Sequence, residues 1–483
     1  MSTSFEHSLW LQHSWVNAKA QVGSDHFAVY DPASGERLAN VSEADSAVVS
    51  AAVDAAFAAW PCWRDSASSL RQQYLAQWAD ALYQQRQLLA QIICRESGKV
   101  YREAEAEILS CRNTLLWYAS ECRRLQGEHI GSDNNLQRFT CKQSIGVTAC
   151  ITPWNFPAAA VVVKVGAALA AGCTVVLKPS EKTPLIALAL AWLAHQAGFP
   201  AGSVNVVATS RPAIFAGALA DPRVAMLSFT GSTAVGKHLY SQCAATVKRL
   251  SLELGGNAPF IVFDDCDINT AVEGLIGARF YNAGQICVGA NRVYVQSGIY
   301  QHFATALATK VAALKVGAGH RASSDFGPLI DNAAAERLQA AVDDAIAKGA
   351  KRLCGGSADP ENPRMYAPTV LSDMQDNMEA CHREVFGPVA CLYRFENEAE
   401  VLARANASPA GLAAYVYTAQ QSRLFRMSKQ LEAGTIGANA THVFADELPF
   451  GGVKQSGLGR EHGSQCLEPF LETKSITMGI QTE

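Results

Sequence analysis

Residues 146–181, with the sequence GVTACITPWNFPAAAVVVKVGAALAAGCTVVLKPSE, contain the pattern that decides the fold. The short β-branched run at 146–152 is followed by an alanine- and valine-rich stretch at 157–171 and a second short run at 174–179. A short apolar run bounded by turn residues predicts a buried strand, and the longer stretch predicts a helix. Strand, helix and strand in this order predict a βαβ unit with parallel strands.

The same alternation continues along the chain and predicts an α/β protein with a doubly wound parallel sheet. The next segments of that sheet are 183–197, VNVVAT (204–209), 212–219, AMLSFTG (225–231), 232–243 and LSLEL (250–254). A second α/β unit begins after residue 254 with APFIVF (258–263), a helix at 268–281, RVYVQ (292–296) and a helix at 299–315. Its later elements are 333–350, AYVYT (414–418) and IGANA (436–440).

Segments outside these two units predict helices and a ribbon. Helices are expected at about 44–60, 65–95 and 99–122, and FTCKQSIG (139–146) predicts a ribbon strand. The C-terminal PFLETKSITMGI (469–480) has the alternating character of an isolated strand. Such a strand either completes a sheet in a partner subunit or folds back onto its own chain.

The bulk composition excludes several classes of protein. A chain of 483 residues is too long for one hydrophobic core, and 49% apolar with 17% charged residues is ordinary for a globular protein. The net charge of −4 gives no reason to expect nucleic acid or an anionic membrane as a partner. The N-terminus has neither a basic region nor an apolar region that would direct export, so we expect a cytoplasmic protein with reduced thiols.

The segment FYNAGQICVGANR (280–292) raises the question of what Cys287 does. It is one of 14 cysteines, the chain has no C-x-x-C pair, and no close Cys or His could share a metal with Cys287. We therefore expect neither a disulfide nor a metal site. Two interpretations remain: a buried filler, as for Cys94, Cys173 and Cys266, or a nucleophile.

Unusual residues fall where the predicted strands of the first sheet end, which is where open parallel sheets bind ligands. In SFTGSTAVGK (228–237), Gly231 permits a turn, Ser232 caps a helix and Gly236 allows close packing. This start suits a phosphate, although an ordinary capped helix has the same pattern. Lys178 and Glu181 in VVLKPSE either bracket a ribose or form a solvated salt bridge.

Two further strand ends carry polar groups in apolar surroundings. Asn155 lies between two prolines in TPWNFP, where a fixed amide could serve as an oxyanion donor or merely cap a turn. Glu253 ends the apolar run LSLEL, and burial would raise its pKa and make it a better base near neutral pH.

Long motifs give the chain a resemblance to a known family. They are ITPWNFP (151–157), LKPSEKTP (177–184), FTGSTAVGK (229–237), LELGGNAPFIVFDD (252–265), NAGQICVGANR (282–292), EVFGP (384–388) and PFGGVKQSGLGRE (449–461). From about residue 8 to residue 480 the chain resembles the aldehyde dehydrogenase superfamily, and within it the succinate-semialdehyde dehydrogenases. The resemblance implies a Rossmann-type NAD(P)-binding domain (1–125 and 144–253), an α/β catalytic domain (254–467) and an oligomerisation ribbon (126–143 and 468–483).

The resemblance also implies roles for the residues above. Cys287 is the nucleophile, Asn155 binds the oxyanion, Glu253 activates the hydrolytic water, and Lys164 is a fourth catalytic residue. Glu253 argues against relatives that pass the acyl group to coenzyme A. The residues expected to hold the dinucleotide are Thr152, Pro153, Trp154, Lys178, Ser180, Glu181, Gly231, Ser232, Gly236, Leu254, Gly255, Glu384 and Phe386. Because Glu181 would repel a 2′-phosphate, NAD is expected as the preferred cofactor, with NADP as the alternative.

The expected substrate pocket departs from that of succinate-semialdehyde dehydrogenases. Its residues are Phe156, Val163, Tyr281, Ile286, Val288 and Phe444. Tyr281 and Val163 stand where those relatives have carboxylate-binding arginines, so a less charged or aromatic aldehyde is the alternative to succinate semialdehyde. Arg112, Asn113 or His442 could supply a replacement contact. Gly289 replaces the second cysteine of the redox loop found in some relatives.

The resemblance leaves two further expectations. Its oligomerisation elements imply a homodimer or homotetramer, and the small-molecule partner is an aldehyde. A catalytically silent structural or binding protein of the same fold is the alternative from another functional class, and the presence of Cys287, Glu253 and Asn155 argues against it.

Overall fold

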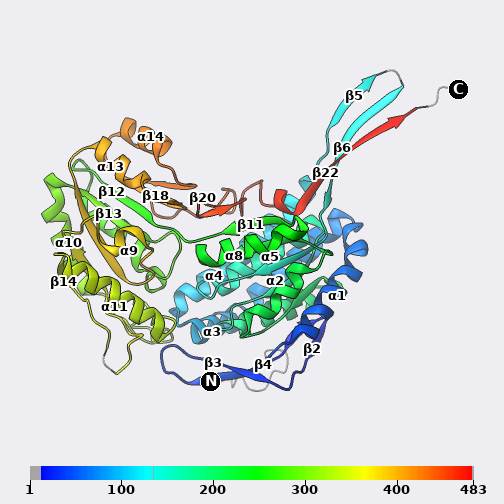
Figure 1. Ribbon diagram of the computed structural model, residues 1–483, viewed down its shortest axis with the longest axis horizontal. Helices are drawn as coiled ribbons and strands as arrows, with labels where there is room; N and C mark the ends of the chain where they lie inside the picture. Colours follow the sequence, from blue (N-terminus) through cyan, green and yellow to red (C-terminus); the bar gives the residue numbers. More distant parts are fainter. Residues whose placement is uncertain (1–11, 134, 360, 481–483) are drawn as a thin grey trace.

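The computed structural model describes residues 12–133, 135–359 and 361–480 (Figure 1). Two sheets, each covered by helices, lie side by side, and a ribbon projects from one end of the molecule. The α/β class predicted from the sequence is confirmed. Residues 1–11 and 481–483, which we assigned to the first domain and to the oligomerisation segment, lie outside the described residues.

The first sheet has eight strands in the order β2-β1-β9-β8-β7-β10-β11-β21. Its five central strands are parallel, as the sequence predicts: β7 (Val147–Ile151), β8 (Thr174–Lys178), β9 (Val204–Val206), β10 (Val224–Thr230) and β11 (Arg249–Glu253). The helices between them are α5 (Pro157–Ala171), α6 (Pro184–Gln196), α7 (Ala216–Ala220) and α8 (Thr233–Cys243). This order brings the carboxyl ends of β8, β7, β10 and β11 next to one another.

The edges of this sheet were not predicted. Antiparallel strands β1 (Ser14–Val16), β2 (Lys19–Gln21) and β21 (Gly457–Leu458) extend it on both sides. Elements of two or three residues are too short to show a period. Because β21 pairs with β11, the chain rejoins the first sheet before residue 467, where we placed the end of the catalytic domain. The division into domains itself stays a prediction.

Four helices precede the parallel strands of the first sheet: α1 (Ser46–Arg64), α2 (Ser68–Gln84), α3 (Arg86–Ser97) and α4 (Tyr101–Glu121). The single helix predicted over 65–95 was wrong, because the backbone leaves helical geometry at Gln85 and separates α2 from α3. By length and composition α1 could cross a bilayer, but Val49, Ala52, Val53 and Ala56 pack into a core cluster with residues of the sheet.

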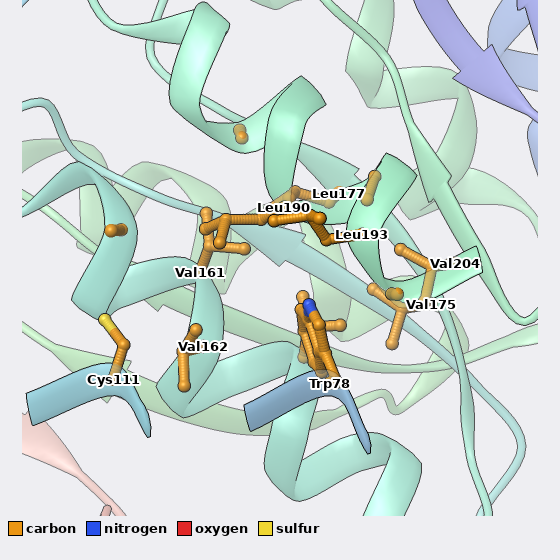
Figure 2. Close-up of a cluster of buried hydrophobic side chains, with 14 of the residues drawn as sticks. Trp78, Cys111, Val161, Val162, Val175, Leu177, Leu190, Leu193 and Val204 are labelled. Atoms are coloured by element: carbon orange, nitrogen blue, oxygen red, sulfur yellow. The ribbon is translucent and has the colours of Figure 1, made fainter. Parts of the chain in front are cut away.

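A core cluster fills the space between the first sheet and its helices (Figure 2). Trp78 of α2, Cys111 of α4 and Val161 of α5 meet side chains of β8 and α6 there, and all three are at most 2% exposed. Cys111 is thus a buried apolar side chain. The packing fixes α4 and α5 against each other, which matters because the loop before α5 carries Asn155.

The second sheet has seven strands in the order β14-β15-β16-β13-β12-β18-β19. They are β14 (Lys351–Cys354), β15 (Thr369–Ser372), β16 (Val389–Phe395), β13 (Ala290–Gln296), β12 (Ala258–Val262), β18 (Ala413–Tyr417) and β19 (Thr435–Ala438), and β14 alone is antiparallel to its neighbour. The helices named in this part of the molecule are α9 (Ile268–Phe280), α10 (Tyr300–Ala312), α11 (Asn332–Ala347), α12 (Glu379–His382), α13 (Glu398–Asn406) and α14 (Gln421–Gln430).

The projecting ribbon consists of β5 (His129–Asp133), β6 (Leu136–Ser144) and β22 (Leu471–Gly479). β22 runs antiparallel to β6 over its whole length, with Leu471 opposite Ser144 and Gly479 opposite Leu136. The C-terminal strand thus pairs with its own chain at β6, and its pairing with a partner subunit stays a prediction. In the described chain β22 has a strand on one side only.

Candidate active site

Cys287 lies in the loop between α9 and β13, beside the end of β11. The backbones approach so closely that a Cβ at Gly256 would lie 2.2 Å from the Cys287 carbonyl oxygen. Cys287 is half-buried, whereas Cys94 and Cys173 are fully buried. Burial raises the pKa of the Cys287 thiol, and the carboxyl groups of Glu384 and Glu253 raise it further.

The turn before Cys287 has an unusual backbone. Asn282, Ala283 and Gly284 all have left-handed conformations, with φ of 49°, 55° and 71°. Such a conformation costs a residue with a Cβ about 1–2 kcal/mol, although asparagine tolerates it better than most. The surroundings must therefore hold this turn in place.

Asn155 lies against the turn. Its Nδ2 donates to the Gln285 carbonyl oxygen at 3.0 Å, and its own carbonyl oxygen accepts from Asn282 Nδ2 at 3.0 Å. Asn155 is 8% exposed, so both contacts are largely shielded from water. One Nδ2 hydrogen is used by Gln285, and an amide nitrogen carries two. The structure thus brings the Asn155 amide to the Cys287 loop.

Glu253 ends β11 and is 4% exposed. Neither of its carboxylate oxygens has a hydrogen-bond partner of normal geometry among the described residues. Burial raises its pKa well above the ordinary value, Glu461 raises it further, and Lys164 lowers it. A buried carboxyl group whose pKa is raised in this way is a proton acceptor that works near neutral pH.

Lys164 points from α5 toward the same region. Its Nζ donates to Glu461 Oε1 at 2.7 Å and to Ser228 Oγ at 3.3 Å, and its side chain is 1% exposed. Glu461 was not predicted as a site residue. It ends the GLGRE motif, far along the chain from Lys164, and no local pattern shows that the two meet.

The dinucleotide residues of the first sheet gather at its strand ends. Ser232 caps α8, with its Oγ accepting from the Val235 N–H at 3.4 Å, and the Gly231 N–H donates to the Glu253 carbonyl oxygen. A Cβ at Gly236 would lie 2.3 Å from a methyl group of Leu254, so a larger residue would require the Leu254 side chain to move. The free N–H groups of such a helix start suit a phosphate.

Lys178 ends β8, which β7 separates from β10 in the sheet, and Glu181 follows three residues later. Lys178 Nζ is 3.6 Å from a Glu181 carboxylate oxygen and donates to the Pro179 carbonyl oxygen, and burial lowers its pKa. The Glu181 side chain is 40% exposed and able to turn toward a ligand. The remaining predicted residues of this part are buried or half-buried in the adjoining loops: Thr152, Pro153, Ser180, Leu254 and Gly255.

Glu384 approaches the cysteine from the second sheet. Burial raises its pKa to about 8, and its Oε1 has no partner among the described residues. Arg279, fully buried at the end of α9, donates to the carbonyl oxygens of Val385, Gly387 and Val389 and so fixes this loop. Phe386 of the same loop meets Trp154 edge to face, with ring centroids 5.6 Å apart.

An apolar cavity of about 240 Å³ lies between α7 and α8, and we did not predict its residues. They are Ile151, Pro212, Ala213, Phe215, Ala216, Leu219, His238, Leu239 and Gln242. A flat aromatic base fits such a slot, while the adjacent Ser232 N-terminus fits a phosphate and Glu384 with its unpartnered oxygen fits a ribose hydroxyl. The described residues therefore suit a dinucleotide. Among them no group of three or more His, Cys, Asp or Glu is placed to hold a metal.

The predicted substrate residues have three kinds of surroundings. Phe156 and Tyr281 stack with ring centroids 6.2 Å apart, next to the loops of Asn155 and Cys287. Val163, Ile286 and Val288 are buried. Phe444 is 41% exposed and stacks on Phe450 at 4.3 Å.

Arg112, Asn113 and His442 were the three candidates to replace the carboxylate-binding arginines of the relatives. The Arg112 guanidinium lies over the Tyr83 ring and donates to Asn113, and both Asn113 and His442 are exposed.

Comparison with known proteins gives a consistent result. The family model described as "Aldehyde dehydrogenase family" matches residues 15–476. The chain is 44% identical to succinate-semialdehyde dehydrogenase (NADP(+)) of Escherichia coli, over 99% of both chains. It is 43% identical to glutarate-semialdehyde dehydrogenase of Pseudomonas putida, over 99% of this chain and 98% of that one.

Solved structures agree. The crystal structure of succinate-semialdehyde dehydrogenase from Burkholderia pseudomallei superposes with a TM-score of 0.96 at 42% identity and covers 98% of both chains. The chain belongs to the aldehyde dehydrogenase family.

Proposed function

We propose that this NAD(P)-dependent aldehyde dehydrogenase oxidises its substrate through Cys287, Asn155 and Glu253. The supporting observation is their convergence: a half-buried thiol, an amide hydrogen-bonded to the loop of that thiol, and a buried carboxyl group without a partner. A nucleophile, an oxyanion donor and a general base are the three parts that acyl chemistry needs.

The chemistry follows from these groups. The Cys287 thiolate attacks the aldehyde carbon, and the carbonyl electrons move to oxygen, where Asn155 Nδ2 and the Cys287 backbone N–H donate hydrogen bonds. When bound, the nicotinamide cofactor supplies the hydride acceptor that turns the adduct into a thioester. Glu253 then takes a proton from water, whose oxygen attacks the thioester. The carbon–sulfur bond breaks, and the carboxylic acid leaves as the thiolate is restored.

NAD is the preferred cofactor in this proposal. The half-exposed Glu181 can accept hydrogen bonds from ribose hydroxyl groups and repels a 2′-phosphate. One relative is named for NADP(+), so the preference depends on this chain's own carboxylate rather than on its family.

The substrate in this proposal is a less charged aldehyde than succinate semialdehyde, either aromatic or a semialdehyde with its polar end further out. The Phe156–Tyr281 stack offers an apolar wall beside the reacting groups, and Arg112 is engaged by Tyr83 and Asn113. A carboxylate desolvated without a cation loses charge-assisted hydrogen bonds worth about 1.5–3 kcal/mol each.

One assay tests the proposal. The protein is mixed with NAD and with succinate semialdehyde, benzaldehyde-type or medium aliphatic aldehydes, and absorbance at 340 nm is followed. Cys287→Ala is expected to lower kcat at least about a thousandfold, whereas the half-buried Cys266 tolerates the same change. Activity that survives Cys287→Ala contradicts the mechanism. A kcat/KM for succinate semialdehyde at least about tenfold above the others contradicts the substrate proposal, and Arg112 is then the first residue to replace.

A further inference from the structure

Three charged side chains near the loops of Asn155 and Cys287 have no role in the mechanism described above. Lys99 lies two residues before α4, Glu103 and Glu107 lie in its first two turns, and all three are buried. Lys99 Nζ pairs with Glu107 Oε2 at 2.5 Å, where the two side chains are 0% and 1% exposed. Buried charges of this kind are retained only with partners that satisfy them.

Glu107 holds the helix that follows Asn155. Its Oε1 accepts from the N–H groups of Ala158 and Ala159 at 2.9 and 3.0 Å, in the first turn of α5. Phe156, the N-cap residue of α5, provides no side-chain cap. Lys99 Nζ also lies 3.9 Å from the centroid of the Phe156 ring. The ion pair is therefore attached to the end of the loop that carries Asn155.

Glu103 holds the other loop. Its Oε2 accepts from the Asn282 N–H at 3.0 Å, at the first of the three left-handed residues before Cys287. Asn282 in turn donates from Nδ2 to the Asn155 carbonyl oxygen and to the Gln285 carbonyl oxygen. A short chain of contacts thus runs from α4 through Asn282 to both Asn155 and the cysteine loop.

We propose that Glu103 is a positioning residue for aldehyde oxidation, because it fixes the left-handed turn at Asn282 and thereby the placement of Cys287 relative to the Asn155 amide. Glu107 and Lys99 anchor the opposite loop to the same helix, so one face of α4 holds both halves of the oxyanion site. The inference rests on the proposed roles of Cys287 and Asn155. Small displacements of an oxyanion donor reduce transition-state stabilisation more than substrate binding.

Three variants test this inference: Glu103→Ala, Glu103→Gln and, as a matched control on the same helix, Glu105→Ala. Glu105 is half-exposed, and its nearest charged contact is Arg86 at 3.8 Å. For each variant, kcat and KM for aldehyde and NAD, the melting temperature and the alkylation of Cys287 by iodoacetamide are measured. Alkylation needs the thiol but no oxyanion donor, so it separates the nucleophile from its surroundings.

Glu103→Ala is expected to lower kcat at least tenfold while KM for NAD and the alkylation of Cys287 change less than threefold. Glu103→Gln keeps an acceptor for the Asn282 N–H and is expected to retain at least a third of kcat, as is Glu105→Ala. If Glu103→Ala keeps more than half of kcat, or if Glu103→Gln loses as much as Glu103→Ala, the inference is overturned. If Glu103→Ala does not fold, the comparison of Glu103→Gln with Glu105→Ala decides alone. Failure of the proposed function is distinct, since Cys287→Ala would then stay active.

Discussion

At the scale of single residues, Glu384 makes the stability of the protein depend on pH. Its pKa is raised to about 8 by burial, above the ordinary 4.5 of a glutamate in an unfolded chain. Between these two values the folded protein holds a proton that the unfolded chain has lost. The contribution of Glu384 to the free energy of unfolding is therefore fully present below pH 4.5 and is lost as pH rises toward 8. Each unit by which the folded pKa exceeds the unfolded pKa corresponds to about 1.4 kcal/mol.

Glu384→Gln removes this dependence because glutamine is neutral throughout. Relative to the parent, the melting temperature of the variant without cofactor is expected to improve steadily from pH 5 to pH 8, and its affinity for NAD is expected to fall. Thermal melts at several pH values check this. An unchanged difference between the two proteins across the range would show that Glu384 does not titrate there.

Glu181 provides a test of cofactor choice. Glu181→Ser removes the carboxylate that repels a 2′-phosphate and leaves Lys178, 3.6 Å away, without its charged partner. We expect the ratio of kcat/KM for NADP to that for NAD to rise at least about tenfold, which corresponds to about 1.4 kcal/mol. Glu336→Ser on the exposed face of α11 is the control. A parent enzyme that already prefers NADP would contradict the proposal.

How far the site could be predicted depended on the range of the interactions. Asn155, Glu253 and Cys287 lie in motifs that mark strand ends and loops, and the structure brings the three together. Glu461 meets Lys164 across nearly 300 positions, and Glu103 meets Asn282 across 179. Neither contact produces a periodic or local pattern in the sequence, so both are visible only in the folded structure.

At the scale of secondary-structure elements, α5 and α6 begin in the same way. Both start with proline and lack a side-chain cap of their own. Glu96 of α3 accepts from the N–H groups of Leu185 and Ile186 at 2.9 and 3.0 Å and so closes the first turn of α6, as Glu107 does for α5. Carboxylates at helix N-termini also interact favourably with the helix dipole.

Glu96→Ala should therefore destabilise the protein. It leaves two buried N–H groups without an acceptor, and we expect the free energy of unfolding to fall by about 2–4 kcal/mol. Urea unfolding followed by tryptophan fluorescence measures the change. The exposed Glu336→Ala is expected to change it by less than about 0.5 kcal/mol. Equal midpoints for both variants would contradict a capping role for Glu96.

The elements that the sequence did predict are those with a sustained pattern. The parallel strands β7, β8 and β10 have four or more apolar or β-branched residues, and β11 has two leucines that alternate with polar residues. Each of these strands was expected within a few positions. β21 is two residues long and owes its pairing to the edge of β11. The break at Gln85 was missed because the apolar pattern continues from α2 into α3.

At the scale of the whole molecule, the projecting ribbon predicts assembly. β22 lies at one edge of the three-stranded sheet, and its side chains are mostly exposed. An open edge of this length invites pairing with another chain. We expect sedimentation to give a dimer or tetramer of the 51.6 kDa chain.

A chain ending at Leu471 is expected to sediment as a smaller species, and a chain ending at Ile480 serves as the control. A full-length protein that sediments at about 52 kDa contradicts the prediction.

The pairing of strands that lie far apart in the sequence has a consequence for biosynthesis. β22 pairs with β6 more than 300 positions earlier, and β21 closes the edge of β11 more than 200 positions earlier. Neither β21 nor β22 exists until nearly the whole chain has been synthesised. The edge of β11, the strand that ends in Glu253, is therefore unpaired on the nascent chain. Closing such distant pairs is slow, and exposed strand edges favour aggregation in the meantime. Refolding from denaturant is accordingly expected to need low protein concentration, and fragments cut short near residue 450 are expected to be caught by chaperones rather than to reach an active form.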